Sequence, residues 1–359
     1  MKMERELYRN LGRPYPSTED AIERKARKEY RMMTDEERES FHEALNFLKR
    51  YPVGDSNYYD SFSDFHLAHV SPAAHWGPGF FGWHKQYLLR MESALQAVDP
   101  TVTIPYWDAT LDSHLVGQEA DSILWTDDFL GNREGFVETG PFANWRTPRK
   151  VVGGYYLKRG NATFSPITID MQYDYVMAIE DFRGLTSYID NSFEYIIHGW
   201  AHAWVGGAMS EIENSPLDPV FFMHHSFIDM MWDAQREIVY KNGGKDKYVY
   251  PSIDDDEAFG VGIDYKSAKD SPHYPLTKLH PFDILNKDAL DEKYMTTYYY
   301  EAPPKCSASN PDCGSPYLFC IIETYKCAPK LTSQAECEKY ATSDCCYKGK
   351  CVDGYCQPE

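Results

Sequence analysis

The cysteines divide this chain of 359 residues into two unequal parts. All nine lie between Cys306 and Cys356, and none occurs before them. The long first part can bury a hydrophobic core, whereas a tail of about fifty residues needs covalent cross-links for stability. We therefore predict a body over residues 1–302 and a cysteine-rich C-terminal domain over residues 303–359, joined at Pro303-Pro304.

The spacing within the tail favours disulfides over a zinc knuckle, which is the alternative. The first four cysteines follow one another at seven-residue steps, unlike the short pairs that bind zinc. Disulfides persist outside the cytosol, so the tail predicts a secreted, extracellular protein. The first ten residues, MKMERELYRN, lack the apolar centre of a signal peptide, so this expectation rests on the cysteines. The odd cysteine is left free or bonded to another chain.

The charge balance narrows the classes of partner. Lys and Arg number 36 and Asp and Glu 55, which gives a net charge of 36 − 55 = −19. This acidic balance argues against nucleic acid and anionic membranes as partners. No stretch approaches the ~18 consecutive apolar residues of a membrane span.

Apolar residues recur at helical spacing along the body. They predict helices over residues 34–50, from 55 or 56 to 66, 83–98, 192–204 and 218–240. Thr34 and Glu37 form a capping box for the first helix, and Asp218-Pro219 gives the last one a cap followed by proline. Between residues 108 and 189 the chain is rich in Gly, Pro and Asn, and we expect long loops there.

Histidines on the last four predicted helices, together with His75 in the loop before residue 83, form two groups of three. The groups are His66, His75 and His84, and His198, His202 and His225. His198 and His202 are four residues apart on one helix, so both can share one metal. The pattern predicts a mainly α fold, a four-helix bundle around a metal site with long loops.

Each group offers three imidazoles and no cysteine. Neutral imidazole binds zinc, copper, iron and nickel, and two adjacent all-histidine sites favour a pair of copper ions. A catalytic zinc with three histidines is the alternative. Spacing alone leaves His69 as a competitor of His66, and His224 as a competitor of His225. The other histidines, which we expect to be structural or on the surface, are His42, His114, His273 and His280.

Several motifs in both halves resemble the tyrosinase, catechol oxidase and haemocyanin family of type-3 copper proteins. They are YDSFSDFH (59–66), HWGPGFFGWH (75–84), IPYWD (104–108), HGWAH (198–202), Gly206-Gly207 and DPVFFMHH (218–225) with Asp229. The resemblance covers roughly residues 25–300 and is similar to the invertebrate, molluscan-type branch. It implies two copper ions, with His66 and His225 rather than their neighbours as ligands.

The resemblance also implies a reaction. The copper pair would use O2 to oxidise o-diphenols to o-quinones, and to hydroxylate monophenols at the ortho position. The substrates would be small phenols or catechols, or tyrosine and DOPA side chains, and the quinones would feed melanin formation or crosslinking.

Two residues near His198 bear on the balance between these activities. A phenol with a pKa near 10 needs a base before hydroxylation. In the family a Glu at the position of Glu194 holds a water that serves as this base, often with an Asn where this chain has Gly199. The alternative for Glu194 is a carboxylate that stabilises the first turn of its helix. Because Gly199 offers no side chain, we expect o-diphenol oxidation to exceed monophenol hydroxylation.

This chain departs from the family at other positions. Relatives often link the second histidine to a cysteine by a thioether, but position 73 is Ala, so packing and hydrogen bonds must orient His75. Gly82 stands where Pro is frequent, and Lys85 where Arg is common. We expect Asp229 either to accept a hydrogen bond near a ligand or to fix a neighbouring helix. Phe221 is expected to pack against a ligand ring rather than to gate substrate, and Asp229 and Phe221 could both be ordinary core residues.

Three other functions share the copper pair. A reversible oxygen carrier of the haemocyanin type excludes phenols with an added domain, for which the chain between Tyr240 and Cys306 is too short. A latent enzyme could be shielded by the aromatic segment Tyr317-Leu318-Phe319, although a role in the core of the tail is preferred. A matrix protein without catalysis would not need all six histidines.

Overall fold

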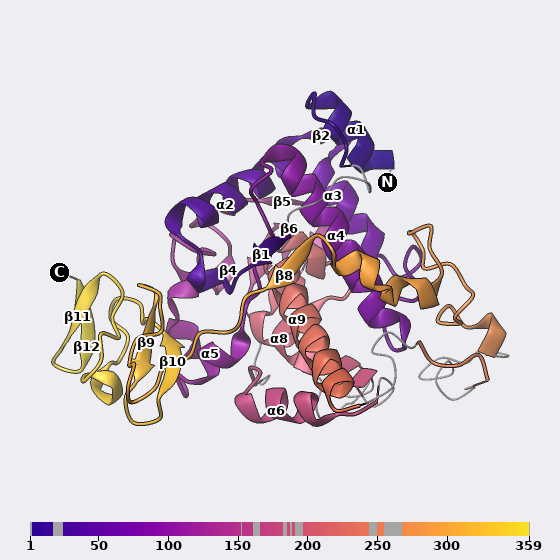
Figure 1. Cartoon of the computed structure of the whole chain (residues 1–359). Helices are drawn as coiled ribbons and strands as arrows, with labels where there is room; N and C mark the ends of the chain where they lie inside the picture. Colours follow the sequence, from indigo (N-terminus) through magenta and orange to yellow (C-terminus); the bar gives the residue numbers. More distant parts are fainter. Residues whose placement is uncertain are drawn as a thin grey trace.

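The computed structural model describes residues 2–16, 24–151, 153–160, 166–181, 185–186, 189–190, 197–243, 250–254 and 268–358. The helices are α1 Lys2–Asn10, α2 Asp35–Arg50, α3 Tyr58–Ser63, α4 Gly79–Val98, α5 Ala109–Ser113, α6 Asp170–Ala178, α8 Ile197–Val205 and α9 Val220–Lys241. A helical body carries the tail at one side, next to α5 (Figure 1).

The strands are short and pair two by two. They are β1 Lys25–Arg27, β2 Pro52–Val53, β3 Ser56–Asn57, β4 Gly135–Phe136, β5 Arg146–Val151, β6 Gly154–Tyr156, β7 Lys158–Arg159, β8 Tyr298–Tyr300, β9 Leu318–Ile321, β10 Lys326–Pro329, β11 Gly349–Val352 and β12 Tyr355–Pro358. The pair β1–β8 is parallel and joins segments from opposite ends of the body.

The helix boundaries follow from local chemistry. The capping box of Thr34 and Glu37 is present, and α2 ends at Arg50, which confirms the first predicted helix. α4 begins at Gly79, four residues earlier than expected, because Phe80 and Phe81 are also buried. Asp218 accepts a hydrogen bond from the backbone of Val220 at 3.1 Å, so it caps α9 although that helix begins only after Pro219.

Two predicted helices differ from the structure in extent. α3 ends at Ser63, and His66 lies on a separate 3-10 turn, Asp64–His66, not on a continuous α-helix. The helix predicted over residues 192–204 is α8 from Ile197 to Val205, and residues 191–196 lie outside the described residues.

The centre of the body is the bundle of α3, α4, α8 and α9. Phe62 on α3 stacks on Tyr87 of α4 with ring centroids 4.7 Å apart, and both side chains are buried. α4 and α9 are the longest of these helices and pack against each other, while α8 packs against α9 (Figure 1). The fold is therefore mainly α with a four-helix bundle and a disulfide-rich tail, as predicted. None of the helices described is long and apolar enough to cross a membrane.

Gly82 shows why α4 lacks a larger residue there. A Cβ at this position would lie 2.8 Å from the Cβ of Ala289, so only glycine lets the 3-10 turn Asn286–Leu290 approach the helix. Close packing of backbones is a common reason for glycine inside a helix.

The tail consists of two modules with the same connectivity. Its four disulfides are Cys306–Cys320, Cys313–Cys327, Cys337–Cys351 and Cys346–Cys356. Counting only the bonded cysteines, the first of each module bonds to the third and the second to the fourth. The last two face each other across a hairpin, β9–β10 or β11–β12. Cys345 is the free cysteine and is buried. The predicted disulfide framework is confirmed.

The aromatic segment of the tail packs against the body and the tail core. The ring of Tyr317 lies 5.0 Å from that of Phe129, and the Arg38 guanidinium lies 4.7 Å from the Tyr317 ring centroid. Leu318 shares an apolar cluster with Leu111, and Phe319 belongs to the core of the tail. These contacts fix the tail next to α2 and α5.

Candidate metal centre

The first histidine group comes from three different local structures. His66 lies on the 3-10 turn after α3, His75 in the following loop and His84 on α4. The Nε2 atom of His66 lies 3.1 Å from Nε2 of His75 and 3.4 Å from Nε2 of His84. The Nε2 atoms of the three imidazoles thus converge on one position.

The second group comes from two helices. Nε2 of His225 on α9 lies 3.2 Å from Nε2 of His198 and 3.3 Å from Nε2 of His202, both on α8. His224 points elsewhere, since its Nε2 lies 3.0 Å from the backbone carbonyl of His198. The geometry therefore favours His225 over its neighbour, a choice that spacing alone left open.

The two groups face each other. The rings of His84 and His225 stack with centroids 4.0 Å apart and an interplanar angle of 8°, and those of His75 and His198 lie 5.8 Å apart. Phe221 packs against His225 at a centroid distance of 4.2 Å and against His66 at 5.0 Å. The bundle thus brings all six histidines into one centre.

Hydrogen bonds hold the far side of three of these rings. The Nδ1 atoms of His66, His84 and His202 lie 2.9, 3.0 and 2.9 Å from the backbone carbonyls of Ile212, Phe80 and Met209. A ring that donates from Nδ1 presents the lone pair of Nε2, which is the arrangement found in metal-binding histidines.

The donor set fits a metal ion. Separations of 3.1–3.4 Å between Nε2 atoms match three ligands around one ion at bond lengths of about 2.0–2.1 Å. Burial, with smaller contributions from neighbouring histidines, lowers the pKa of His66, His84, His202 and His225 well below the ordinary value. These four rings are therefore neutral at physiological pH, as ligands must be.

A cavity of about 200 Å³ reaches the centre. Three of its lining residues, Trp76, Ser210 and Ile212, are exposed, so the cavity opens at the surface. Gly199 on α8 forms part of its wall, together with Ala203 one turn later. Glu194, the expected partner of Gly199, lies outside the described residues.

The remaining histidines take no part in the two groups. His69 and His280 are exposed. His42 is buried against the Tyr30 hydroxyl at 2.6 Å, and His114 binds the carboxylate of Asp170. His273 is buried behind the loop that carries His75, where Nδ1 accepts from the backbone of Gly79 at 3.3 Å.

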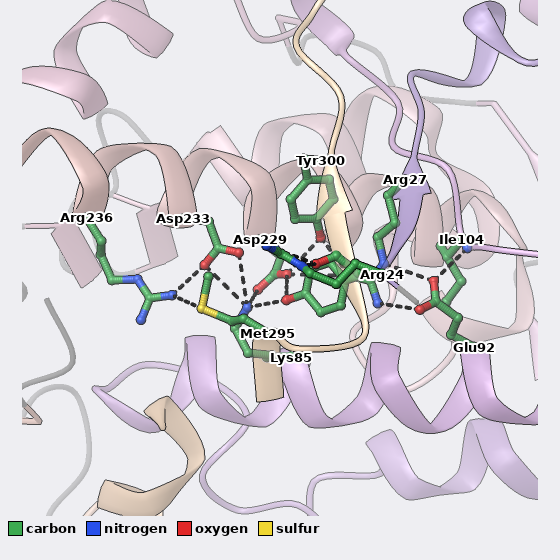
Figure 2. Close-up of polar contacts among 11 residues, drawn as sticks. Arg24, Arg27, Lys85, Glu92, Ile104, Asp229, Asp233, Arg236, Met295 and Tyr300 are labelled. Atoms are coloured by element: carbon green, nitrogen blue, oxygen red, sulfur yellow. Dashed lines mark hydrogen bonds and ion pairs between the residues drawn. The ribbon is translucent and has the colours of Figure 1, made fainter. Parts of the chain in front are cut away.

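Asp229 fixes neighbouring elements. Its carboxylate forms an ion pair with Lys85 at 2.8 Å and accepts hydrogen bonds from the hydroxyls of Tyr298 at 3.1 Å and Tyr300 at 2.7 Å. Figure 2 shows Lys85, Asp229 and Tyr300 in one network with Arg27 and Glu92, and the ion-paired side chains of Arg27 and Glu92 are buried. These contacts favour a role of Asp229 in fixing neighbouring elements over a role as a hydrogen-bond acceptor near a ligand.

Sequence reasoning missed Phe80 and Asp190. The Phe80 ring lies 4.6 Å from that of His84 and 4.9 Å from that of His198, between the two groups. Asp190 is buried, and its carboxylate lies 3.3 Å from Nδ1 of His198. Burial alone would raise the pKa of Asp190, but the histidines around it hold that pKa well below its usual range. Phe80 lies one turn before His84 on α4, so helical spacing could have indicated that it packs near the ligands. Asp190 follows a loop-rich stretch, where no periodic pattern marks it.

Comparisons with known proteins agree with this geometry. A family model described as the common central domain of tyrosinase matches residues 56–237. The tyrosinase-like protein tyr-3 of Caenorhabditis elegans is 34% identical over 347 residues, which cover 92% of this chain and 47% of the relative. The chain thus spans about half the length of that relative.

Shorter relatives and solved structures extend the likeness. The tyrosinase of Streptomyces antibioticus is 34% identical over 231 residues, 57% of this chain and 81% of the relative. A mutant polyphenol oxidase from Thermothelomyces thermophila has the same fold, with a TM-score of 0.62 at 19% identity over 84% of this chain and 98% of its own. A functional unit of Octopus hemocyanin also has this fold, with a TM-score of 0.52 at 19% identity over 77% of this chain and 68% of its own. The chain belongs to the tyrosinase family of type-3 copper proteins.

Proposed function

We propose that this protein is a copper oxidase that uses O2 to oxidise o-diphenols to o-quinones and that hydroxylates monophenols more slowly. Two copper ions would be held by His66, His75 and His84, and by His198, His202 and His225. The observation that carries the proposal is the face-to-face placement of two convergent groups of Nε2 atoms at the end of an open cavity.

The bound copper pair would supply the redox chemistry, in which two diphenols lose four electrons and four protons to one O2 and give two quinones and two waters. The chain's own residues hold and shield the centre. Backbone carbonyls fix three imidazoles, and the rings of Phe80 and Phe221 pack between the groups and exclude water from them. A cavity of about 200 Å³ suits a single phenolic ring.

The open cavity favours an enzyme over an oxygen carrier. A carrier must keep phenols from the copper pair, yet Trp76 is 44% exposed where it lines the cavity. The described part of the tail contributes no lining residue, because Tyr317 packs against Phe129 instead. This also argues against a latent form in which that segment fills the cavity.

The wall of the cavity supports the expected substrate preference. Gly199 follows His198 and lines the cavity without a side chain that could hold a water. A diphenol with acidic, adjacent hydroxyls depends less on such a water than a monophenol does. We also propose that the protein works outside the cell, where its four disulfides persist, on phenols destined for pigment or crosslinks.

The test is a copper titration of the metal-free protein, followed by a catechol assay. We expect two copper ions per chain, oxygen consumption, and quinone formation from catechol. Zinc should bind without supporting turnover. Reversible uptake of O2 without quinone formation would instead identify a carrier, and binding of fewer than two ions would contradict the proposed centre.

A further inference from the structure

Asp190 is placed where the two histidine groups meet. The residue is 5% exposed and lies a few residues before α8. One carboxylate oxygen, Oδ1, lies 3.3 Å from Nδ1 of His198 and 3.6 Å from Nδ1 of His75. The first distance is that of a weak hydrogen bond, and the second is an electrostatic contact. One carboxylate thus faces one imidazole of each group.

The other oxygen of Asp190 holds the backbone next to His75. The backbone N–H of Trp76 donates to Oδ2. Trp76 has a φ of 59°, the left-handed conformation that a bulky side chain rarely adopts. Such a conformation persists only where surrounding contacts enforce it, and it clusters at functional sites. The hydrogen bond from Trp76 is a contact of that kind.

These contacts set Asp190 apart from the other groups behind the ligands. His66, His84 and His202 are held by backbone carbonyls, each from a single segment. Among the residues described, Asp190 is the one side chain within ion-pair distance of ligands from both groups. A charged acceptor also makes the opposite ring nitrogen a stronger donor to a metal.

We propose that Asp190 is a positioning residue that ties the two halves of the copper centre together. Its carboxylate orients His75 and His198 through their Nδ1 atoms and fixes Trp76 at the mouth of the cavity. In this chain a thioether cannot orient His75, because position 73 is Ala instead of the cysteine of relatives. Asp190 orients His75 instead. The inference deepens the proposed function and rests on it.

Asp190→Asn tests the role at nearly constant volume. The amide has one acceptor oxygen, so it cannot both face the two imidazoles and accept from the Trp76 backbone. We expect copper affinity to fall about 10- to 100-fold, which is typical when the group behind a ligand is lost. Asp60→Asn is the matched control, since Asp60 is also 5% exposed and pairs with Lys49 instead of a histidine. The control should bind copper like the wild type.

Three further experiments separate a positioning role of Asp190 from a general effect on stability. When both ions are copper(II) and are held close together, their spins couple and the electron paramagnetic resonance signal is weak. If the pair is held less tightly in Asp190→Asn, this variant should show the resonance signal of isolated Cu(II). Asp190→Glu keeps the carboxylate and should restore part of the affinity. If Asp190→Asn fails to fold, nitrogen-15 NMR spectra of the metal-free wild type test the role of Asp190. We expect them to show that His75 and His198 carry their ring proton on Nδ1. Assignment would use His75→Asn and His198→Asn.

The outcomes distinguish this inference from the proposed function. Failure of the wild type to bind two copper ions would reject the proposed function itself. Two ions in the wild type, with unchanged affinity and resonance signal in Asp190→Asn, would overturn the role of Asp190 alone. Ring protons on Nε2 of both His75 and His198 in the metal-free wild type would also overturn the role of Asp190. A third tightly bound ion per chain would also overturn it, because Asp190 with His75 and His198 would then be a metal site.

Discussion

Lys85 and Asp229 form a buried ion pair, with Nζ and the carboxylate oxygen 2.8 Å apart. Lys85 directly follows His84 on α4, and Asp229 lies one turn after His225 on α9. The pair therefore joins the two helices whose histidine rings stack at the metal centre. Tyr298 and Tyr300 extend the network to β8, and Figure 2 shows Tyr300 beside Asp229.

Removing one member of this pair should be costly. Lys85→Met keeps an apolar stem but leaves the Asp229 and Asp233 carboxylates without their ammonium partner. Breaking a buried pair in this way costs about 3–5 kcal/mol. We expect a loss of that size in the free energy of unfolding, measured by urea denaturation.

Lys28→Met is the control for Lys85→Met. Lys28 pairs with Glu37 at 2.7 Å, but both side chains are partly exposed. Such pairs contribute about 0–1 kcal/mol. Equal losses for the two variants would contradict a special role for the Lys85–Asp229 pair.

Features set by neighbouring residues could be predicted from the sequence. The capping box of Thr34 and Glu37 depends on residues three apart, and the apolar stripe of α4 depends on helical spacing, so both were confirmed. The disulfide framework followed from the number and spacing of the cysteines. The six histidines could be grouped because helical faces and motifs carry them.

Contacts between distant segments could not be predicted in this way. Asp190 meets His75 only because the loop after α3 and the segment before α8 fold onto each other. The parallel pair of β1 and β8 joins residues near opposite ends of the body. Neither relationship leaves a periodic signal, and the boundary between body and tail at Pro303-Pro304 stays a prediction.

The neighbours His224 and His225 should differ in copper binding. His225→Gln removes the nitrogen that faces His198 and His202, so we expect one tightly bound copper ion in place of two. His224→Gln keeps an N–H that can donate to the His198 carbonyl and should retain both ions. Metal analysis after dialysis measures the stoichiometry, and the opposite result would exchange the two roles.

Gly199→Asn should shift the substrate balance. An amide at this point of the cavity wall can hold a water near a bound phenol, whereas Gly199 offers no side chain to do so. Because general base catalysis is worth about 10²–10⁴-fold at full efficiency, we expect the ratio of monophenol to catechol rates to rise by about tenfold. Ala203→Asn places the same amide one turn later and serves as control. A similar rise in both variants would remove the special role of position 199.

Removal of the tail should affect stability more than catalysis. Cleavage after Glu301 takes away Tyr317 and exposes Phe129 and Arg38, which the tail covers. We expect a lower melting temperature and an unchanged KM for catechol, since no described tail residue lines the cavity. A strong rise in activity after cleavage would support the latent form instead.

The docking of the tail should also depend on pH through Asp170. This carboxylate lies 2.9 Å from Nε2 of His114 and pairs with Lys326 of β10, while Nδ1 of His114 lies 2.7 Å from the carbonyl of Cys327. The hydrogen bond with His114 is the largest cause that lowers the pKa of Asp170 to about 2. A carboxyl with a lowered pKa stabilises the fold above its unfolded pKa of about 3.9, and this contribution disappears as the pH falls through the folded value.

Asp170→Asn should therefore melt at a lower temperature than the wild type at pH 6, with a difference that shrinks between about pH 4 and pH 2. Asp283→Asn is the control, because Asp283 pairs with Lys278 on the open surface, where an ion pair adds little. Thermal melts of all three proteins across this range provide the measurement. A difference between wild type and Asp170→Asn that persists unchanged at pH 2 would show that the charge of Asp170 does not hold the tail.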